Sequence, residues 1–231
     1  MDTHGTESAQ GFWNLLTTED RYVLRTLGQS RKYRSGMTMC VEGEPATHLF
    51  IIVDGWVKVF SVTDDGHEIT LALRGGGDVV GEAAGEIAGR RSATMQAMET
   101  VDALVVGYER FSSFLDTHPS ANRAYRRAMA LRYSDADMML RRRTAMSGAQ
   151  RLASLLLELA GRHGSQADFG IELSLPLSQE ELASLVGTSR ATVARALSNW
   201  RKRGFIRTGP RRIALIDLPA LRRVAGPGWG T

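Results

Sequence analysis

Residues 179–206 read QEELASLVGTSRATVARALSNWRKRGFI, two helix-forming runs that meet at Gly187. Ser178 stands just before the first run, and Glu181 follows it three residues later. In a capping box of this spacing, the serine side chain accepts a hydrogen bond from the glutamate's amide, and the glutamate reaches back to the serine's amide. Gly187 suits the left-handed conformation that a tight turn between helices requires. The stretch therefore predicts a capped helix that ends in a tight turn.

Ser189 is placed to cap a second helix over residues 190–203, which Gly204 closes. We expect the apolar face of this helix to be buried, and it consists of Val193, Ala194, Leu197 and Trp200. The other face, near the helix start, carries Arg190, Ala191, Thr192 and Arg195. A helix-turn-helix places such residues at base edges in the major groove, where an arginine fork can bond guanine. Look-alikes of this motif occur in ordinary helical cores. Here the caps, the turn and both faces agree, so the stretch predicts DNA binding.

The flanking residues extend this unit. After it, residues 205–216 predict two short strands around a Gly-Pro turn, which would form a basic wing. Before it, residues 151–160 predict an amphipathic helix, residues 161–170 a polar loop and residues 171–175 a short strand.

The charge is distributed unevenly along the 231 residues. Residues 1–118 carry 10 basic and 17 acidic side chains, residues 119–146 carry 7 and 2, and residues 147–231 carry 12 and 6. Positive charge gathered in the C-terminal half favours a nucleic-acid partner there, although a charged region can also be simply solvated.

The region before residue 118 predicts β structure. A helical run over residues 12–27 precedes several short β-rich runs, which are separated by glycine turns. Asp54-Gly55 and Asp65-Gly66 each stand between two such runs, and Asp-Gly between strands is a signal of a tight hairpin. Short strands at this spacing predict a closed or sandwiched β domain.

Residues 119–146 predict one long helix. The run has no glycine or proline after Pro119 and is rich in good helix formers. A narrow apolar seam recurs along it, at Met129, Tyr133, Ala136 and Leu140. The seam could pack on its own domain or pair with its twin in a homodimer. A helix of roughly 40 Å between a β domain and a basic domain favours the homodimer.

Several protein classes are not favoured. There is no apolar run long enough to span a membrane, and residues 1–10 lack the pattern of a secretory signal. Cys40 is the single cysteine, which excludes an internal disulfide and a cluster held by several cysteines of one chain. We expect Cys40 to be a small buried residue and the protein to be cytoplasmic. We also expect no enzyme, because the chain shows no paired carboxylates, nucleophile motif or metal cluster. The glycine-rich run 75–78 lacks the Lys-Ser or Lys-Thr of a phosphate loop.

The stretch 179–206 closely resembles the winged helix of the Crp–Fnr regulators. The resemblance extends over roughly residues 15–217 and includes the spaced glycines Gly36, Gly43, Gly55, Gly66 and Gly77. It implies an α+β chain of three parts: an N-terminal cyclic-nucleotide-binding-type β jelly roll over 12–118, a long dimerisation helix over 119–146, and a C-terminal winged helix-turn-helix over 147–225. The implied partners are a second copy of the chain, double-stranded DNA with a palindromic operator, and RNA polymerase, with no membrane.

The resemblance also assigns DNA contacts. It implies that Arg190 and Arg195 read bases and that Ser189 and Thr192 contact phosphate or base, and Ser178 is also expected to be a DNA-binding residue. Family members that read the best-known half-site carry a glutamate where this chain has Ala191. A carboxylate can accept a hydrogen bond from cytosine and a methyl group cannot, so the preferred half-site is expected to differ or to be relaxed.

A second match lies in the β region. Gly81-Glu82, together with Arg91-Ser92-Ala93-Thr94, resembles the phosphate-binding cassette of cyclic-nucleotide domains. Arg91 and Ser92 would bind the phosphodiester, and Glu82 would accept from the ribose hydroxyl. The same match pairs Glu82 with Arg132 of the long helix, which would link ligand occupancy to that helix. A Glu–Arg pair of this kind also occurs as a plain structural salt bridge.

The resemblance favours cyclic AMP as the allosteric ligand, and cyclic GMP, another nucleotide or no ligand stays open. Family members that bind cyclic AMP contact the adenine with a Thr-Ser pair on the long helix, where this chain has Ala136 and Asp137. Ser134 would substitute in another register. An iron–sulfur sensor needs several cysteines. A haem sensor would need an axial ligand, for which His48 and His67 are candidates, although each is more typical of a surface or strand-edge histidine.

Together these features predict a homodimeric, sequence-specific transcription regulator. Ligand binding would bias the long helix and a hinge near residues 146–148, and so set the separation of the two recognition helices. The alternatives are a ligand-independent or differently liganded regulator of the same family, a cyclic-nucleotide regulatory subunit that does not bind DNA, and an enzyme.

Overall fold

The computed structural model describes residues 11–66, 68–86 and 89–226, with side chains 85–86 and 135–144 excepted, and it divides into two compact units. The first unit ends at Tyr133 and the second begins at Ser134.

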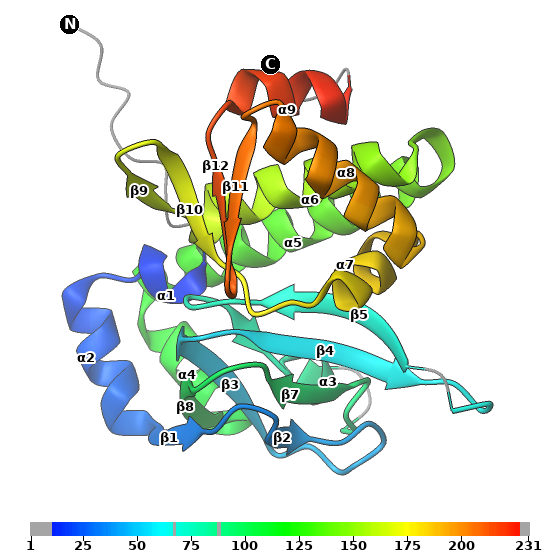
Figure 1. The fold of residues 1–231 in the computed structure, drawn as a ribbon. Coiled ribbons are helices and arrows are strands. Elements are labelled where there is room, and N and C mark those ends of the chain that lie inside the picture. The colour runs from blue at the N-terminus through cyan, green and yellow to red at the C-terminus, as the bar shows by residue number, and fades with distance from the viewer. Residues whose placement is uncertain (1–10, 67, 87–88, 227–231) are drawn as a thin grey trace, which may run out of the picture. The chain divides into compact units, whose positions relative to one another are not determined.

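The first unit contains two antiparallel four-stranded sheets (Figure 1). One sheet has the order β1-β8-β3-β6, with strands Gln29–Tyr33, Val101–Gly107, His48–Asp54 and Val79–Val80. The other has the order β2-β7-β4-β5, with strands Thr38–Cys40, Thr94–Ala97, Val57–Val62 and Glu68–Arg74. Buried side chains of both sheets, including Phe50, Ile52, Val57 and Met95, share one core cluster. The predicted sandwich of short strands is confirmed.

One predicted hairpin is wrong and the other is confirmed. The turn at Asp54-Gly55 joins β3 to β4, but β3 pairs with β8 and β6, whereas β4 pairs with β5 and β7. The chain therefore crosses from one sheet to the other here. Gly55 has φ +89°, and a Cβ on it would lie 2.5 Å from the Thr100 carbonyl oxygen. Asp65-Gly66 does lie in the connection between two paired strands, β4 and β5.

Helices accompany the two sheets. They are α1 (Phe12–Leu15), α2 (Thr18–Leu27), α3 (Ala83–Glu86), α4 (Tyr108–Thr117) and α5 (Pro119–Ala145). The single helix expected over residues 12–27 is two helices, because Thr17 leaves the helical conformation and caps α2 by accepting from the Asp20 amide at 3.0 Å.

The long helix α5 begins at Pro119, as expected. Its first half packs on its own domain, where Ala121, Ala124 and Ala128 are buried and Met129 is partly buried against the same core. Tyr133 is 79% exposed. The predicted seam is therefore divided, with Met129 on the domain core and Tyr133 facing outward. The side chains of Ala136 and Leu140 lie outside the described residues.

The second unit contains one antiparallel sheet of order β11-β12-β10-β9, with strands Ile206–Gly209, Arg212–Leu215, Gly170–Ser174 and Ser165–Ala167. Its helices are α6 (Gly148–His163), α7 (Gln179–Val186), α8 (Arg190–Lys202) and α9 (Leu218–Ala225). The predicted wing is confirmed as β11 and β12. Part of the expected polar loop is strand β9, and α9, whose start is capped by Asp217, was not anticipated from the sequence.

Candidate functional site

The helix-turn-helix is capped as the sequence predicts. Ser178 accepts from the Glu181 amide at 3.1 Å, and the Glu181 carboxylate accepts from the Ser178 amide at 2.8 Å. Gly187 then takes the left-handed conformation, with φ +65°. Ser189 caps α8 by accepting from the Thr192 amide at 3.2 Å, and the two hydroxyls lie 2.9 Å apart. The turn and the start of α8 are therefore fixed by local hydrogen bonds.

The buried face of α8 differs from the expectation at one position. Val193, Leu197 and Trp200 are buried, together with Ala196, whereas Ala194 is only half-buried. Positions 193, 196, 197 and 200 follow the helical spacing of three and four, so Ala196 completes the inner stripe. Trp200 anchors it at 3% exposure.

The outer face of α8 presents cations at its N-terminal end. Arg190, Ala191 and Arg195 are exposed, and Thr192 is half-buried. Arg190 lies 3.7 Å from the Glu180 carboxylate, but both side chains are about 70% exposed, so this ion pair holds Arg190 only weakly. The Arg195 guanidinium has one long contact, 3.5 Å to the Thr192 hydroxyl. Both guanidinium groups are therefore available to a ligand in solvent.

Further cations lie at the end of α8 and on the wing, where sequence reasoning named no site residues. Arg201 donates to the Thr208 hydroxyl of β11 at 3.2 Å and so links the recognition helix to the wing. Arg211, in the turn between β11 and β12, has φ +54°, and its carbonyl accepts from the Leu175 amide at 2.8 Å. The basic run at the end of α8 was the signal for Arg201, and the basic sequence between the strands was the signal for Arg211.

Of the cassette residues predicted in the first unit, Arg91 contacts Gly81, which directly follows β6. Arg91 is 3% exposed, and its guanidinium lies 3.4 Å from the Gly81 carbonyl oxygen, 3.3 Å from the Tyr108 hydroxyl and 5.2 Å from the centre of the Phe50 ring. The Tyr108 hydroxyl itself donates to the Gly81 carbonyl at 2.6 Å. Tyr108 was not predicted, because nothing in its spacing connects it to the cassette. Ser92 is exposed.

Glu82 and Arg132 are brought together, as the resemblance implied. Their side chains form a 3.1 Å ion pair and are only 13% and 23% exposed. Arg132 also donates to the Val79 carbonyl at 2.8 Å, so α5 is tied to β6 and to the cassette. The second carboxylate oxygen of Glu82 is buried and has no hydrogen-bond partner among the described residues. A buried acceptor without a donor costs about 1–3 kcal/mol, so this atom is suited to a donor brought by a ligand, such as a hydroxyl.

The metal and haem candidates of the sequence are described only in part. Among the described residues, no three His, Cys, Asp or Glu side chains gather to hold a metal ion. Cys40 is buried, as predicted, and burial raises the pKa of its thiol. The haem-ligand candidate His67 lies outside the described residues. The side chains of Ala136 and Asp137, which stand where cyclic-AMP-binding members contact the adenine, are not described either. Among the helices that the structure describes, none is long and apolar enough to cross a bilayer.

His48 lies half-buried against the Phe50 ring, with the ring centres 4.9 Å apart. Burial lowers the pKa of its imidazole, and the Arg91 and Arg31 charges lower it further. The unfolded chain therefore binds a proton more readily than the folded chain as the pH falls below about 6.5. We expect the free energy of unfolding to decrease between pH 7.5 and 5.5, and to decrease less in His48→Gln. Urea titrations at both pH values measure the free energy of unfolding. An equal decrease between pH 7.5 and 5.5 in the wild type and in His48→Gln would contradict the prediction.

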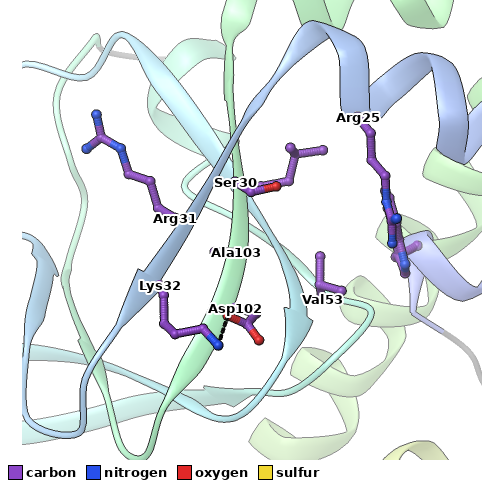
Figure 2. Close-up of a pocket in the computed structure, with 9 residues that line it drawn as sticks. Arg25, Ser30, Arg31, Lys32, Val53, Asp102 and Ala103 are labelled. Atoms are coloured by element: carbon purple, nitrogen blue, oxygen red, sulfur yellow. Dashed lines mark ion pairs between the residues drawn. The ribbon is translucent and has the colours of Figure 1, made fainter.

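A separate groove lies on the first sheet (Figure 2). It measures about 330 Å³ and is lined by Trp13, Arg25, Ser30, Arg31, Lys32, Val53, Asp102, Ala103 and Leu104. Arg25 stacks over Trp13 at 5.3 Å, and Lys32 pairs with Asp102 at 3.2 Å. None of the predicted ligand residues lines it. Three of the five basic residues between positions 21 and 34 line this groove, a signal that sequence reasoning did not use.

Known protein families match both the N-terminal and the C-terminal half of the chain. The profile of the cyclic nucleotide-binding domain matches residues 30–118, and that of the Crp-like helix-turn-helix domain matches residues 150–224. The "CRP-like cAMP-activated global transcriptional regulator" of Mycobacterium tuberculosis is 32% identical over 190 residues, which cover 82% of this chain and 85% of that protein. The "Cyclic AMP receptor protein" of Thermus thermophilus is 29% identical over 197 residues, covering 85% of this chain and 88% of that protein.

A solved structure supports the fold. FixK2 from Bradyrhizobium japonicum superposes with a TM-score of 0.74 at 22% identity, covering 87% of this chain and 98% of that one. The Mycobacterium relative is named a transcriptional regulator. With its cyclic-nucleotide-binding β domain, its long helix and its DNA-binding helix-turn-helix, the chain belongs to the Crp–Fnr family of transcription regulators.

Proposed function

We propose that this protein is a cytoplasmic homodimer that binds a palindromic operator under the control of a cyclic nucleotide, with cyclic AMP as the first candidate. The observation that carries the ligand proposal is the buried oxygen of Glu82 that has no partner among the described residues, together with the buried Arg91, which contacts the adjacent Gly81. A cyclic nucleotide brings a ribose hydroxyl for the first and a phosphodiester for the second. Gly81 and Ser92 would complete the phosphate site.

The link to DNA binding would run through Arg132. This residue of α5 contacts the Glu82 carboxylate and the Val79 carbonyl. A ligand hydroxyl that bonds Glu82 changes the electrostatic surroundings of the same carboxylate, so occupancy and the position of α5 are coupled energetically. The names of the Mycobacterium and Thermus relatives, which refer to cyclic AMP, support the choice of ligand.

We further propose the division into a sensory domain over 12–118, a dimerisation helix over 119–146 and a DNA-binding domain over 147–225. The outward-facing Tyr133 supports the pairing of α5 with its twin. At the operator, Arg190 and Arg195 would contact base edges, Ser189 and Thr192 phosphate or base, and Ser178 would lie beside them. RNA polymerase is the expected protein partner of the bound dimer.

A second candidate is a regulator of the same family with another ligand or with none. The observation that favours it is in the sequence, where Ala136 and Asp137 replace a Thr-Ser pair that contacts adenine in cyclic-AMP-binding members.

Calorimetry with cyclic AMP and cyclic GMP, together with operator binding, distinguishes these candidates. The operator is a duplex selected by the protein itself from a random-sequence pool. We expect cyclic AMP to release or absorb heat with one site per chain, and to raise operator affinity by about tenfold, within the usual range of allosteric coupling. If only cyclic GMP produced heat, the ligand would be cyclic GMP instead of cyclic AMP. No heat from either nucleotide, with equal operator affinity throughout, would establish the second candidate.

A further inference from the structure

One arginine in the second unit bonds three backbone carbonyls that belong to two different segments. Arg151, in the first turn of α6, donates to Met146 at 2.5 Å, to Val186 at 2.6 Å and to Gly187 at 2.7 Å. Met146 follows the last residue of α5, while Val186 and Gly187 end α7. A single side chain therefore joins the segment after the long helix to the turn of the helix-turn-helix.

These hydrogen bonds have a charged donor and are therefore stronger than bonds between neutral groups. The last carbonyls of a helix have no partner within the helix and carry the negative end of its dipole, so they favour a cation. The guanidinium is planar and its donors point in fixed directions, which lets it bond separate carbonyls at once. An ammonium group on a flexible stem presents a single point of charge and cannot reproduce this fork.

A second contact fixes the same place. A Cβ added to Gly148 would lie 2.3 Å from the Thr188 hydroxyl oxygen and 3.2 Å from a methyl carbon of Thr192. The start of α6 is thus packed directly on the turn and on the first turn of α8. The start of α6 is itself held by a capping box between Ser147 and Gln150. Both sides of the contact are locally ordered.

We propose that Arg151 is a positioning residue for DNA recognition, which joins residues 146–148 to the α7–α8 turn so that the end of the long helix sets the start of the recognition helix. Ser189 and Arg190 follow Gly187 by two and three residues, so a shift of the Gly187 carbonyl is passed directly to them. Binding sites lose function when their groups move by more than about 0.5 Å. The proposal rests on the DNA binding that the family shares, and not on the identity of the ligand.

The test uses full-length Arg151→Gln and Arg151→Lys without nucleotide, with the duplex selected by the wild-type protein and an unselected duplex of equal length. We expect Arg151→Gln to lower affinity for the selected duplex about tenfold, and affinity for the unselected duplex by less than about twofold, because phosphate contacts supply non-specific binding. Arg151→Lys should recover only a small part of the loss. The matched control is Arg223→Gln, which removes an exposed charge from α9. Equal losses on both duplexes, or none, would overturn the proposal.

Hydrogen exchange separates positioning from a plain contribution to stability. In Arg151→Gln we expect faster amide exchange in two peptides together, 145–150 and 183–193, with unchanged exchange in the α9 peptide. Faster exchange throughout α6 and α9 would show only a loosened core and would overturn the positioning role. Gly148→Ala, which pushes on Thr188 without touching the arginine, should lower the same ratio of selected to unselected affinity.

Discussion

Replacement of Arg91 by glutamine is expected to weaken binding of cyclic AMP by at least about 100-fold. Arg91 is almost fully buried, and a phosphodiester bound beside it would lose the cation that balances its charge. Leaving one partner of a buried charge pair alone costs about 3–5 kcal/mol, which corresponds to more than two orders of magnitude in affinity. Calorimetry of the purified variant measures the loss.

The fold should survive this change. Tyr108 continues to donate to the Gly81 carbonyl at 2.6 Å, so the carbonyl that Arg91 contacts keeps a partner. The matched control is Arg90→Gln, one residue away, whose exposed guanidinium donates to the Gly43 carbonyl. We expect the control to bind cyclic AMP within about twofold of the wild type. If Arg91→Gln bound equally well, the cassette would not be the nucleotide site.

Replacement of Arg195 by glutamine is expected to lower the affinity of the dimer for the selected operator by at least about 30-fold. A bidentate contact between arginine and guanine contributes about 1–3 kcal/mol of discrimination, and a symmetric dimer loses two. Arg195 is exposed, and among the described residues its guanidinium has a single long contact, with Thr192, so we expect its removal to leave the fold undisturbed. Anisotropy titrations of labelled duplexes measure the change.

The way in which the loss of affinity varies among duplex sequences shows whether Arg195 contacts a base. Arg195→Gln should relax the preference at one base pair of each half-site and reduce binding to unselected DNA only slightly. Arg222→Gln, on the exposed face of α9, is the control and should change neither. A uniform loss across all duplexes, with a smaller salt dependence, would reassign Arg195 to a phosphate contact.

The DNA-binding unit could be predicted well because its signals are local. Ser178 with Glu181, Gly187 and Ser189 each act within four residues, and the structure contains every one of these caps and the turn. The helical spacing also fixed most of the buried face of α8. The choice of Ala194 instead of Ala196 was an error of a half-turn in phase.

The β domain shows where local reasoning fails. Asp54-Gly55 correctly indicates a tight turn, but a turn does not determine which strands pair across it. Strand pairing depends on how the two sheets bury their inner faces against each other. In this domain β3 and β4 belong to different sheets. For the same reason no spacing pointed to Tyr108 beside Arg91 or to Arg151 beside Gly187, since those contacts join residues 17 and 36 positions apart.

The pairing of β1 with β8 has a consequence for the growing chain. Gln29 lies opposite Val105, and every residue of the first strand waits for a partner about 70 residues further on. At a synthesis rate of about 5–20 residues per second, the first strand stays without its neighbour for roughly 4–14 s. An open strand edge invites pairing with other chains during this interval. Arg31 and Lys32 lie on this strand and Arg34 follows it, and charged side chains on an open strand edge disfavour its pairing with other chains.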